Sequence, residues 1–526
     1  MEVFIDIIKI ASLEKWDYNR RVLVNKYTNK IQKDRGGFSM KHRTILQGFE
    51  WDLPADGQHW KLLAEKAKEL HDLGLSAVWL PPAYKGSAGA DDVGYGVYDH
   101  YDLGEFDQKG TVATKYGTKD DYLEAIKALQ ENNLEVYADI VFNHLMGADE
   151  TEVVPAVKYN WDDRTEAVSE EEEIEAWTKF TFPGRDGKYN DYVWTWENFS
   201  GVDFDTRSKD HAIYNFANKG WDSDVDPEDG NFDYLMGCDL DMENPETIEQ
   251  LDQWGKWHQE LTNVDGYRLD AVKHIQFDYY VDWLINRREE KGKGIFVVGE
   301  YWSNDLGKLK NYLDSSGNLI YLFDVPLHFR FFEAANSNGE FDMQGIFGGT
   351  LIETRQDYAV TFVDNHDTQK GQSLESWVDG WFKVHAYALT LLRKQGVPCV
   401  FWGDLYGIPS QDIAAIGENL HALLYLRSQM AFGNQIDYFD DSDCIGWVLT
   451  GDFEEPTSGI AVVMTNKNGG EKAMTVSAIH RGKTFVDILG NNDAKVVLDN
   501  KGQGIFPVND GQVSIYVQEE VVKKWK

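Results

Sequence analysis

Cysteine is scarce in this chain, which has only three in 526 residues: Cys238, Cys399 and Cys444. They lie far apart and lack the spacing of metal ligands, so the sequence indicates neither a disulfide framework nor a zinc site. Buried free thiols are the simplest interpretation.

Basic residues are also few, because 51 Lys and Arg stand against 89 Asp and Glu, for a formal net charge of -38. Such a charge repels phosphate backbones and anionic lipid surfaces, so we expect no nucleic-acid partner and no membrane partner. The negative charge does not oppose the binding of neutral polymers. The 18 Trp and 26 Tyr are of the kind that stack on sugar faces, although most large aromatic side chains serve the core. Composition therefore permits a carbohydrate partner without showing one.

Long apolar runs are missing as well, and no stretch is long enough to span a bilayer. Near the N-terminus, residues 3–10 are apolar but are interrupted by Asp6 and Lys9, and no small-residue cleavage pattern follows. We therefore expect a cytoplasmic protein. As a separate prediction, we expect a monomer.

Residues 1–39 differ in charge from the rest of the chain, since they hold eight Lys and Arg but five Asp and Glu. Charge asymmetry of this kind can mark an interaction arm. Alternatively, Arg35-Gly36-Gly37 can be encoded by a purine-rich ribosome-binding sequence just before Met40. We hypothesise that natural translation starts at Met40. The intact mass of the protein from its host tests this, and a species that retains residues 1–39 would contradict it.

From Thr44 onward, short runs rich in Val, Ile, Phe and Tyr alternate with longer amphipathic segments, which predicts repeated βα units and a parallel sheet. Eight strands are expected, at residues 44–49, 77–80, 135–142, 266–270, 296–300, 319–324, 359–364 and 398–402. Helical patterns lie between most of them, at residues 60–73, 120–131, 245–261, 277–288 and 381–394. The chain is therefore predicted to be an α/β protein with a (β/α)8 TIM barrel, formed by residues 40–142 and 246–432.

This alternation breaks between the third and fourth expected strands. Residues 143–245 are rich in Trp, Gly and Asp and have no clear helical period, and so long a span cannot be a plain loop. We expect an inserted subdomain there. After about Gln429 the helical pattern ends, and turn-separated strands at residues 459–465, 495–498 and 512–517 predict a C-terminal antiparallel β-sandwich over residues 433–526.

Carboxylates stand at the ends of three expected strands: Asp270 ends the fourth, Glu300 the fifth, and Asp364 the seventh, with Asp367 just beyond. In a barrel, the carboxyl ends of the strands converge on the active-site face. One acidic residue after a strand is more often a helix cap or part of a solvated turn, but three at barrel-compatible positions favour a catalytic site.

Glycoside hydrolysis needs one carboxylate that attacks the sugar and a second, protonated one that donates to the leaving oxygen. Glu300 follows an apolar strand and precedes Tyr301 and Trp302, surroundings that should raise its pKa by desolvation and make it the acid. Asp270 lies two residues after Arg268 with the same side-chain direction, so the guanidinium can hold it ionised and aimed as the nucleophile. A buried salt bridge that only stabilises the barrel is the alternative for this pair.

Four motifs carry a resemblance to a known family: DIVFNH at residues 139–144, GYRLDAVKH at 266–274, GEYW at 299–302 and FVDNHD at 362–367. In this order and at these spacings, the chain resembles the α-amylases of glycoside hydrolase family 13, specifically the bacterial liquefying and intracellular type, from about Thr44 to Val517. The resemblance implies endo-hydrolysis of α-1,4-glucosidic bonds in starch, glycogen and maltodextrins. Retention of configuration through a covalent glycosyl-enzyme would follow.

The resemblance adds Asp367 to Asp270 and Glu300 as a third catalytic carboxylate, which would stabilise the distorted sugar at the transition state. The substrate contacts that it implies are Tyr95, His144, Arg268, Lys273, His274, Trp302 and His366. Of these, Tyr95 would stack beneath the sugar at the cleavage point, and Lys273 and His274 would bind on the leaving-group side. Taken alone, the histidines would more often be structural and Tyr95 would more often pack in the core.

Five aspartates gather in the predicted insert, namely Asp203, Asp222, Asp233, Asp239 and Asp241. Acidic runs are usually only solvated, but oxygen ligands in such number also suit Ca²⁺. The resemblance implies a structural calcium site, with a neighbouring site for Na⁺ or a second Ca²⁺. The first would use Asn143, Asp233, Asp239 and the backbone carbonyl of His274, and the second Asp203, Asp222 and Asp241. Cys238, beside Asp239, would make the site sensitive to oxidation if its thiol were exposed.

Two alternatives stay open for the function. A member of the same family that prefers maltodextrins or cyclodextrins, or that transfers glycosyl groups, would carry the same three carboxylates. The products from amylose, maltotetraose and cyclodextrin would distinguish it. A barrel that binds glucan without catalysis need not keep a matched acid and nucleophile, so the presence of both argues against it.

Overall fold

The computed structural model describes residues 43–292 and 294–525. In this part of the chain, eight parallel strands close into a barrel in the order β1-β16-β15-β14-β13-β12-β5-β2. Their bounds are Ile45–Gln47 (β1), Ala77–Trp79 (β2), Glu135–Ile140 (β5), Gly266–Leu269 (β12), Phe296–Gly299 (β13), Tyr321–Phe323 (β14), Ala359–Phe362 (β15) and Val397–Phe401 (β16). The predicted TIM barrel is confirmed. The predicted N-terminal extension, residues 1–39, lies outside the described residues.

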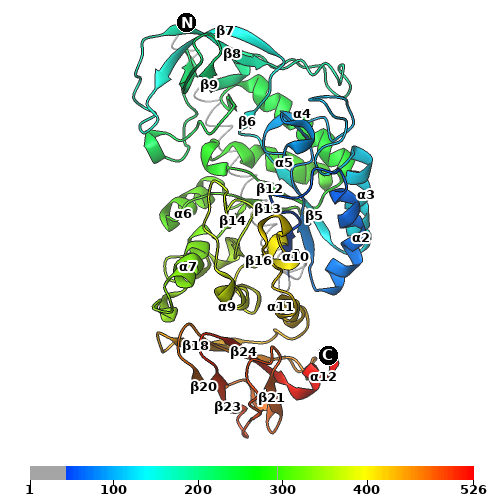
Figure 1. Cartoon of the computed structure of the whole chain (residues 1–526), viewed down its shortest axis with the longest axis vertical. Helices are drawn as coiled ribbons and strands as arrows, with labels where there is room; N and C mark the ends of the chain where they lie inside the picture. Colours follow the sequence, from blue (N-terminus) through cyan, green and yellow to red (C-terminus); the bar gives the residue numbers. More distant parts are fainter. Residues whose placement is uncertain (1–42, 293, 526) are drawn as a thin grey trace, which may run out of the picture.

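Helices surround the barrel in the middle of the molecule (Figure 1). They include α2 (His59–Asp72), α3 (Lys119–Glu131), α4 (Pro245–Thr262), α5 (Tyr279–Lys291), α6 (Leu306–Ser315), α7 (Val325–Asn336), α9 (Gly380–Leu391) and α11 (Glu418–Gln429). Helix α2 shows why such segments are helical, because Trp60, Leu63, Ala67 and Leu70 recur every three or four residues and are all buried. No helix among the described residues is long and apolar enough to cross a membrane.

The register of the strands places the predicted site residues at one level of the barrel. Arg268 on β12 pairs with Asp139 on β5, and Leu269 pairs with Gly299 on β13. Asp270 and Glu300 each follow these paired residues directly, so they leave the barrel side by side at its carboxyl end.

Between β5 and β12, the chain forms a six-stranded sheet in the order β6-β11-β9-β10-β7-β8, in which every pairing is antiparallel. Its strands are His144–Leu145 (β6), Glu150–Tyr159 (β7), Glu172–Lys179 (β8), Phe199–Asp205 (β9), Asp210–Phe216 (β10) and Cys238–Leu240 (β11). This sheet forms the end of the molecule at the top of Figure 1. The insert predicted from the missing helical period is therefore a β structure, which the sequence did not reveal.

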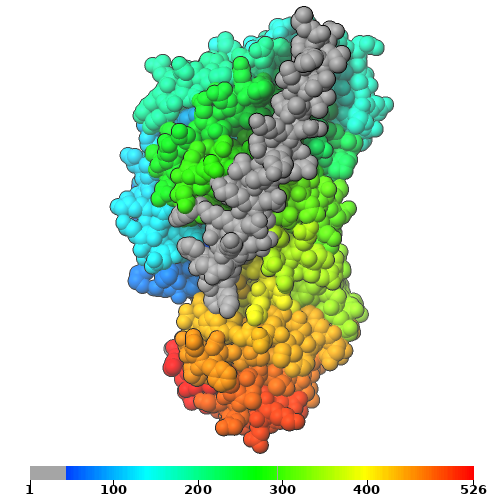
Figure 2. Space-filling model, turned by 180° about the vertical axis from the view of Figure 1, so that it is seen from behind, coloured from blue at the N-terminus to red at the C-terminus, as the bar shows by residue number. Residues whose placement is uncertain are grey.

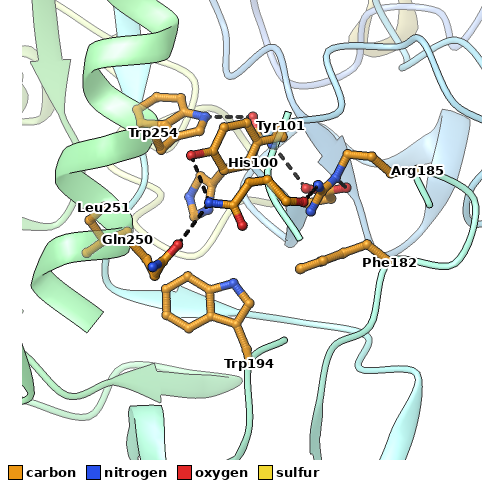
Figure 3. A pocket seen from close by; sticks show the side chains of 10 residues that line it. His100, Tyr101, Phe182, Arg185, Trp194, Gln250, Leu251 and Trp254 are labelled. Carbon is orange, nitrogen blue, oxygen red and sulfur yellow. Dashed lines mark hydrogen bonds and ion pairs between the residues drawn. The ribbon is translucent and has the colours of Figure 1, made fainter. Parts of the chain in front are cut away.

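A buried polar joint fastens the insert to the barrel (Figure 3). Arg185 of the insert donates from Nε to Asp99 Oδ2 at 2.8 Å, and both side chains are buried. Trp254 on α4 donates to the carbonyl of His100 at 2.8 Å. These side chains line a cavity of about 10 Å³, which is room for about one water molecule. Asn190 of the insert also donates to Gln250 Oε1 on α4 at 2.9 Å, so the joint holds the insert against α4.

The C-terminal residues form a second antiparallel structure, with a six-stranded sheet in the order β17-β18-β19-β24-β21-β22 and a two-stranded sheet of β20 and β23. The strands are Gln435–Tyr438 (β17), Cys444–Leu449 (β18), Ile460–Thr465 (β19), Gly470–Thr475 (β20), Thr484–Asp487 (β21), Val496–Val497 (β22), Gln503–Val508 (β23) and Val513–Gln518 (β24). Strands β20 and β23 pack on β18 and β19, as in the predicted β-sandwich. In Figure 2 these residues, orange to red, form a lobe below the barrel. Arg393 of the barrel forms an ion pair with Asp437 of this lobe at 2.8 Å.

Candidate active site

Arg268 is the centre of the candidate site. Its side chain is buried, and its Nη1 donates to Asp139 Oδ1 at 2.9 Å and also to Asp270 Oδ1. Its Nη2 donates to Glu300 Oε2 at 3.0 Å. One guanidinium therefore orients the carboxylates of three neighbouring strands through charge-assisted hydrogen bonds. Asp139 lies within the third predicted strand, and this role for it was not predicted from the sequence.

The surroundings of Glu300 suit a general acid. Its Oε2 also accepts a hydrogen bond from the backbone N–H of Ala271 at 3.0 Å, and Ala271 adopts a left-handed conformation with φ of 46°. Burial, opposed by the charge of Arg268 and supported by that of Asp270, raises the pKa of Glu300 to about 7. Near neutral pH, a large fraction of the molecules therefore keeps a proton here, as the sequence predicted.

Asp367 faces the same group from the loop after β15. Burial, reinforced by the negative charge of Glu300, raises the pKa of Asp367 well above its usual range. Its Oδ2 lies 3.2 Å from Nε2 of His366. Since several carboxyl groups meet around one cation, they titrate together rather than one by one.

Tyr95, His144 and His366 form the wall beside these carboxylates. The Tyr95 hydroxyl donates to Asp139 Oδ2 at 2.9 Å, and His144 Nε2 lies 2.8 Å from the Tyr95 carbonyl. The rings of Tyr95, His366 and Trp51 are nearly parallel, within 10° of one another. Burial lowers the pKa of both histidines, which favours their neutral form, and a neutral imidazole can hydrogen-bond a sugar without carrying charge.

The three predicted carboxylates and six of the predicted substrate contacts line one cleft with a volume of about 350 Å³. The predicted residues in its lining are Tyr95, His144, Asp270, Lys273, His274, Glu300, Trp302, His366 and Asp367. Arg268 lies behind this lining, where it contacts Asp270 and Glu300. The structure thus brings every predicted catalytic and substrate residue to one place.

The cleft also has walls that the sequence did not predict. Trp51 follows the first barrel strand, and Phe232, Leu235 and Met236 come from the insert. Lys273 lies with its Nζ 4.6 Å from the centre of the Phe232 ring and 2.9 Å from Glu228 Oε2. These apolar residues had no sequence signal, because their role depends on how the insert folds over the barrel.

The predicted calcium ligands form a buried acidic cluster beside the cleft. Burial, reinforced by their mutual repulsion, raises the pKa of Asp222, Asp233 and Asp239 well above the usual range. Asn143 Oδ1 and Asp222 Oδ2 are buried and have no hydrogen-bond partner among the described residues. A hard cation such as Ca²⁺ would be coordinated by these unpartnered oxygens and would offset the repulsion between the carboxylates. Within the described residues, however, no three His, Cys, Asp or Glu side chains already stand in a metal-binding arrangement.

The remaining predicted ligands lie around this cluster. Asp241 Oδ2 accepts a hydrogen bond from Lys219 at 2.8 Å, and Asp203 lines a neighbouring cavity together with Cys238. His274 is buried, with Nδ1 2.7 Å from the carbonyl of Phe232. The Cys238 thiol is also buried, which raises its pKa, so the condition for an oxidation-sensitive thiol is not met.

A closed parallel barrel with a carboxyl group of raised pKa, an arginine-bound carboxylate and a further acid at its carboxyl end has the features of a glycoside hydrolase. Residues 52–423 match the family described as "Alpha amylase, catalytic domain". The chain is 51% identical over 476 residues to an alpha-amylase of Geobacillus stearothermophilus, covering 90% of this chain and 86% of that protein. This chain belongs to the α-amylase family.

Further comparisons agree. The chain is 44% identical over 497 residues to the cytoplasmic alpha-amylase of Escherichia coli (strain K12), covering 92% of this chain and 100% of that protein. Among solved structures, an Anoxybacillus alpha-amylase superposes with a TM-score of 0.59 at 18% identity, covering 91% of this chain and 98% of that chain. At that identity, the structural likeness shows the shared fold alone.

Proposed function

We propose that this protein is an α-amylase that hydrolyses internal α-1,4-glucosidic bonds of starch, glycogen and maltodextrins with retention of configuration. The observation that carries the proposal is the double contact of Arg268, which joins the Asp270 carboxylate to the raised-pKa carboxyl of Glu300. A retaining glycosidase needs such a pair, one group to attack and one to donate a proton. The named activity of the G. stearothermophilus and E. coli relatives supports the same assignment.

In this proposal, Asp270 attacks the anomeric carbon and Glu300 protonates the glycosidic oxygen, so that the leaving chain departs with a full hydroxyl. Glu300, now ionised, then takes a proton from a water molecule as that water attacks the anomeric carbon. This attack breaks the bond to Asp270 and releases the sugar with its original configuration. Asp367 stabilises the distorted sugar, and neutral His144 and His366 bind its hydroxyls. Tyr95 lies beneath the sugar, and Lys273, His274 and Trp302 contact the rest of the chain.

Soluble starch tests this function directly. An endo-acting enzyme removes the iodine colour quickly at a low yield of reducing ends, because each internal cut shortens a long chain. Slow colour loss with immediate short products would overturn the endo assignment in favour of a maltodextrin-preferring relative. Absence of any reducing ends would overturn the hydrolase assignment itself.

We also infer a structural Ca²⁺ site in the buried acidic cluster. The unpartnered Asn143 Oδ1 and the mutual repulsion of Asp222, Asp233 and Asp239 support it, and the backbone carbonyl of His274 would complete the ligand set. Asp203 and Asp241 would serve a neighbouring Na⁺ or second Ca²⁺ with Asp222. Bound there, Ca²⁺ would fix the insert to the barrel beside the cleft and would take no part in bond cleavage. Calorimetric titration with Ca²⁺ checks this, and an absence of binding to chelator-treated protein would refute it.

We further propose that the protein works in the cytoplasm as a monomer that binds α-glucan. The E. coli relative is a cytoplasmic alpha-amylase, which supports the location. Fractionation of the native host followed by immunodetection tests the location, and light scattering during gel filtration tests the monomer. Recovery of the protein from the medium, or a mass twice that of one chain, would overturn the respective proposal.

A further inference from the structure

A second group of buried charges lies under the loop that carries Asp367. Lys383 on α9 is only 3% exposed, and its Nζ lies 2.6 Å from Asp364 Oδ2 and 2.5 Å from Asp404 Oδ1. The same ammonium lies 3.3 Å from the centre of the Trp377 ring. Lys383 does not line the catalytic cleft, so its charge has no direct contact with substrate.

The Lys383 ammonium joins the ends of two neighbouring barrel strands. Asp364 lies two residues past the end of β15, and Asp404 belongs to α10 (Trp402–Tyr406), which follows β16 directly. The Tyr387 hydroxyl donates to the second oxygen of Asp404 at 2.6 Å. The helix α9 therefore fixes the carboxyl ends of both strands through a single cation.

A continuous set of hydrogen bonds leads from this ammonium to Asp367. Thr368 Oγ1 donates a hydrogen bond to Asp364 Oδ1 at 2.8 Å. Thr368 Oγ1 also accepts a hydrogen bond from the backbone N–H of Asn365 at 3.0 Å. Asn365 Oδ1 in turn accepts the N–H of Asp367 at 2.9 Å. The backbone of Asp367 is thus held by a turn whose carboxylate, Asp364, depends on Lys383 for its charge partner.

A contribution to folding stability does not by itself explain why Lys383, Asp364 and Asp404 are buried together. Removing two carboxylates and an ammonium from water costs about as much as their attraction returns, and apolar residues of similar volume often serve a core as well. Buried polar groups are best explained where they fix one geometry out of several. Here the fixed geometry is that of the loop whose next side chains, His366 and Asp367, face the cleft.

We propose that Lys383 is a positioning residue for Asp367: through Asp364, Thr368 and Asn365, its ammonium sets the orientation that the third catalytic carboxylate needs at the transition state. The inference rests on the proposed function, and it assigns a role in that reaction to a residue outside the cleft. A displacement of about 1 Å at a reacting group can cost on the order of 100-fold in rate.

A double-mutant cycle that combines substitutions of Lys383 and Asp367, with α-maltotriosyl fluoride as substrate, tests this. Fluoride leaves without a proton from Glu300, so the rate of its release reports mainly on Asp270 and Asp367. We expect Lys383→Met to lower kcat about 10- to 100-fold while KM changes less than about threefold, because the orientation of Asp367 matters most in the transition state. In an Asp367→Asn background, the same substitution should change kcat less than about threefold, because the group that it positions is already gone.

Arg393→Met is the matched control, because it also removes a buried cation from its carboxylate, Asp437, but at the junction with the C-terminal lobe. Its effect on kcat should be small and the same in both backgrounds. Thr368→Val removes only the hydroxyl between Asp364 and Asn365. It provides the same test if the Lys383→Met variant does not fold. It should also lose its effect when combined with Asp367→Asn.

The outcomes separate the two proposals. Equal loss of kcat from Lys383→Met and Thr368→Val in both backgrounds would overturn the positioning role and leave a structural one. A wild-type protein that releases no fluoride and no reducing ends from starch would instead overturn the proposed function.

Discussion

The buried carboxylates of the catalytic site and those of the insert differ in how their charge is balanced. In the catalytic cluster, Asp139, Asp270 and Glu300 share the guanidinium of Arg268. In the insert, Asp222, Asp233 and Asp239 repel one another, and within residues 43–292 and 294–525 no Lys or Arg forms an ion pair with them. Both clusters are similarly buried, so burial alone does not distinguish a reactive site from a metal site.

The difference lies in the source of the positive charge. A cation that belongs to the chain is always present, so the catalytic carboxylates keep one geometry and can have separate protonation states. A cluster without an internal cation is destabilising until an external one binds. The first arrangement suits chemistry, and the second suits a structure that depends on a metal.

Asp270→Asn should cause the largest loss. The substitution keeps the shape and a hydrogen bond to Arg268 but removes the attacking oxyanion, so turnover should fall by about 10⁴-fold or more, as for other essential nucleophiles. Glucan binding, measured by calorimetry, should remain. Asp357→Asn, at the opposite end of β15 and exposed, is the control and should retain full activity. Near-normal turnover in the Asp270 variant would refute the assignment.

Asp233→Asn should remove most of the stabilisation by calcium. With chelator, the variant should unfold at the same temperature as the wild type or higher, because one of three repelling carboxylates is gone. With calcium, the wild type should gain about 3 to 4 kcal/mol at 100 to 1,000 times the dissociation constant, and the variant much less. Differential scanning calorimetry measures both. Glu171→Gln, an exposed change in the same insert, should behave as wild type, and an equal gain in all three proteins would exclude this metal site.

The pH dependence of turnover should reveal the proton on Glu300. The acid acts when protonated, and burial raises its pKa to about 7, so kcat/KM on maltoheptaose should fall about tenfold per unit as pH rises above that value. Release of fluoride from α-maltotriosyl fluoride needs no acid and should lack this alkaline loss. The same alkaline loss with both substrates would assign the proton to another group.

Tyr95→Phe should cause the smallest loss. It keeps the ring that we propose lies beneath the sugar but removes the hydroxyl that donates to Asp139, the partner of Arg268. We expect kcat/KM to fall by about 1 to 2 kcal/mol of transition-state stabilisation, with the temperature of unfolding little changed. Tyr192→Phe, which removes a hydroxyl on the insert, is the control. A loss as large as that of Asp270→Asn would show that Asp139 has a more direct part in the reaction.

Much of the barrel and its carboxylates could be predicted from the sequence, because strand patterns and strand ends are local. Asp270 and Glu300 each follow a barrel strand directly, and the barrel then fixes where those strand ends meet. The sheet of the insert could not be predicted in the same way. In the strand Glu150–Tyr159, for example, only Val154 and Ala156 are buried, Val153 is exposed, and a proline interrupts the pattern, so the segment resembles a polar loop.

The walls of the cleft could not be predicted for a different reason. Trp51 and Met236 lie far apart in the sequence, and neither belongs to a motif that marks a site. They line the same cleft only because the insert folds over the strand ends. Lys383 shows the same limit, since a lysine in an amphipathic helix is usually exposed to solvent. Only its burial between two aspartates indicates a role.

Trapping of the covalent intermediate would test the central claim most directly. The Glu300→Gln variant should still react with α-maltotriosyl fluoride, because fluoride leaves without an acid, but it lacks the base that activates water for the second step. We predict that a maltotriosyl adduct accumulates and that digestion and mass spectrometry locate it on Asp270. Release of fluoride with an adduct on a different residue, or with none at any time, would contradict the mechanism.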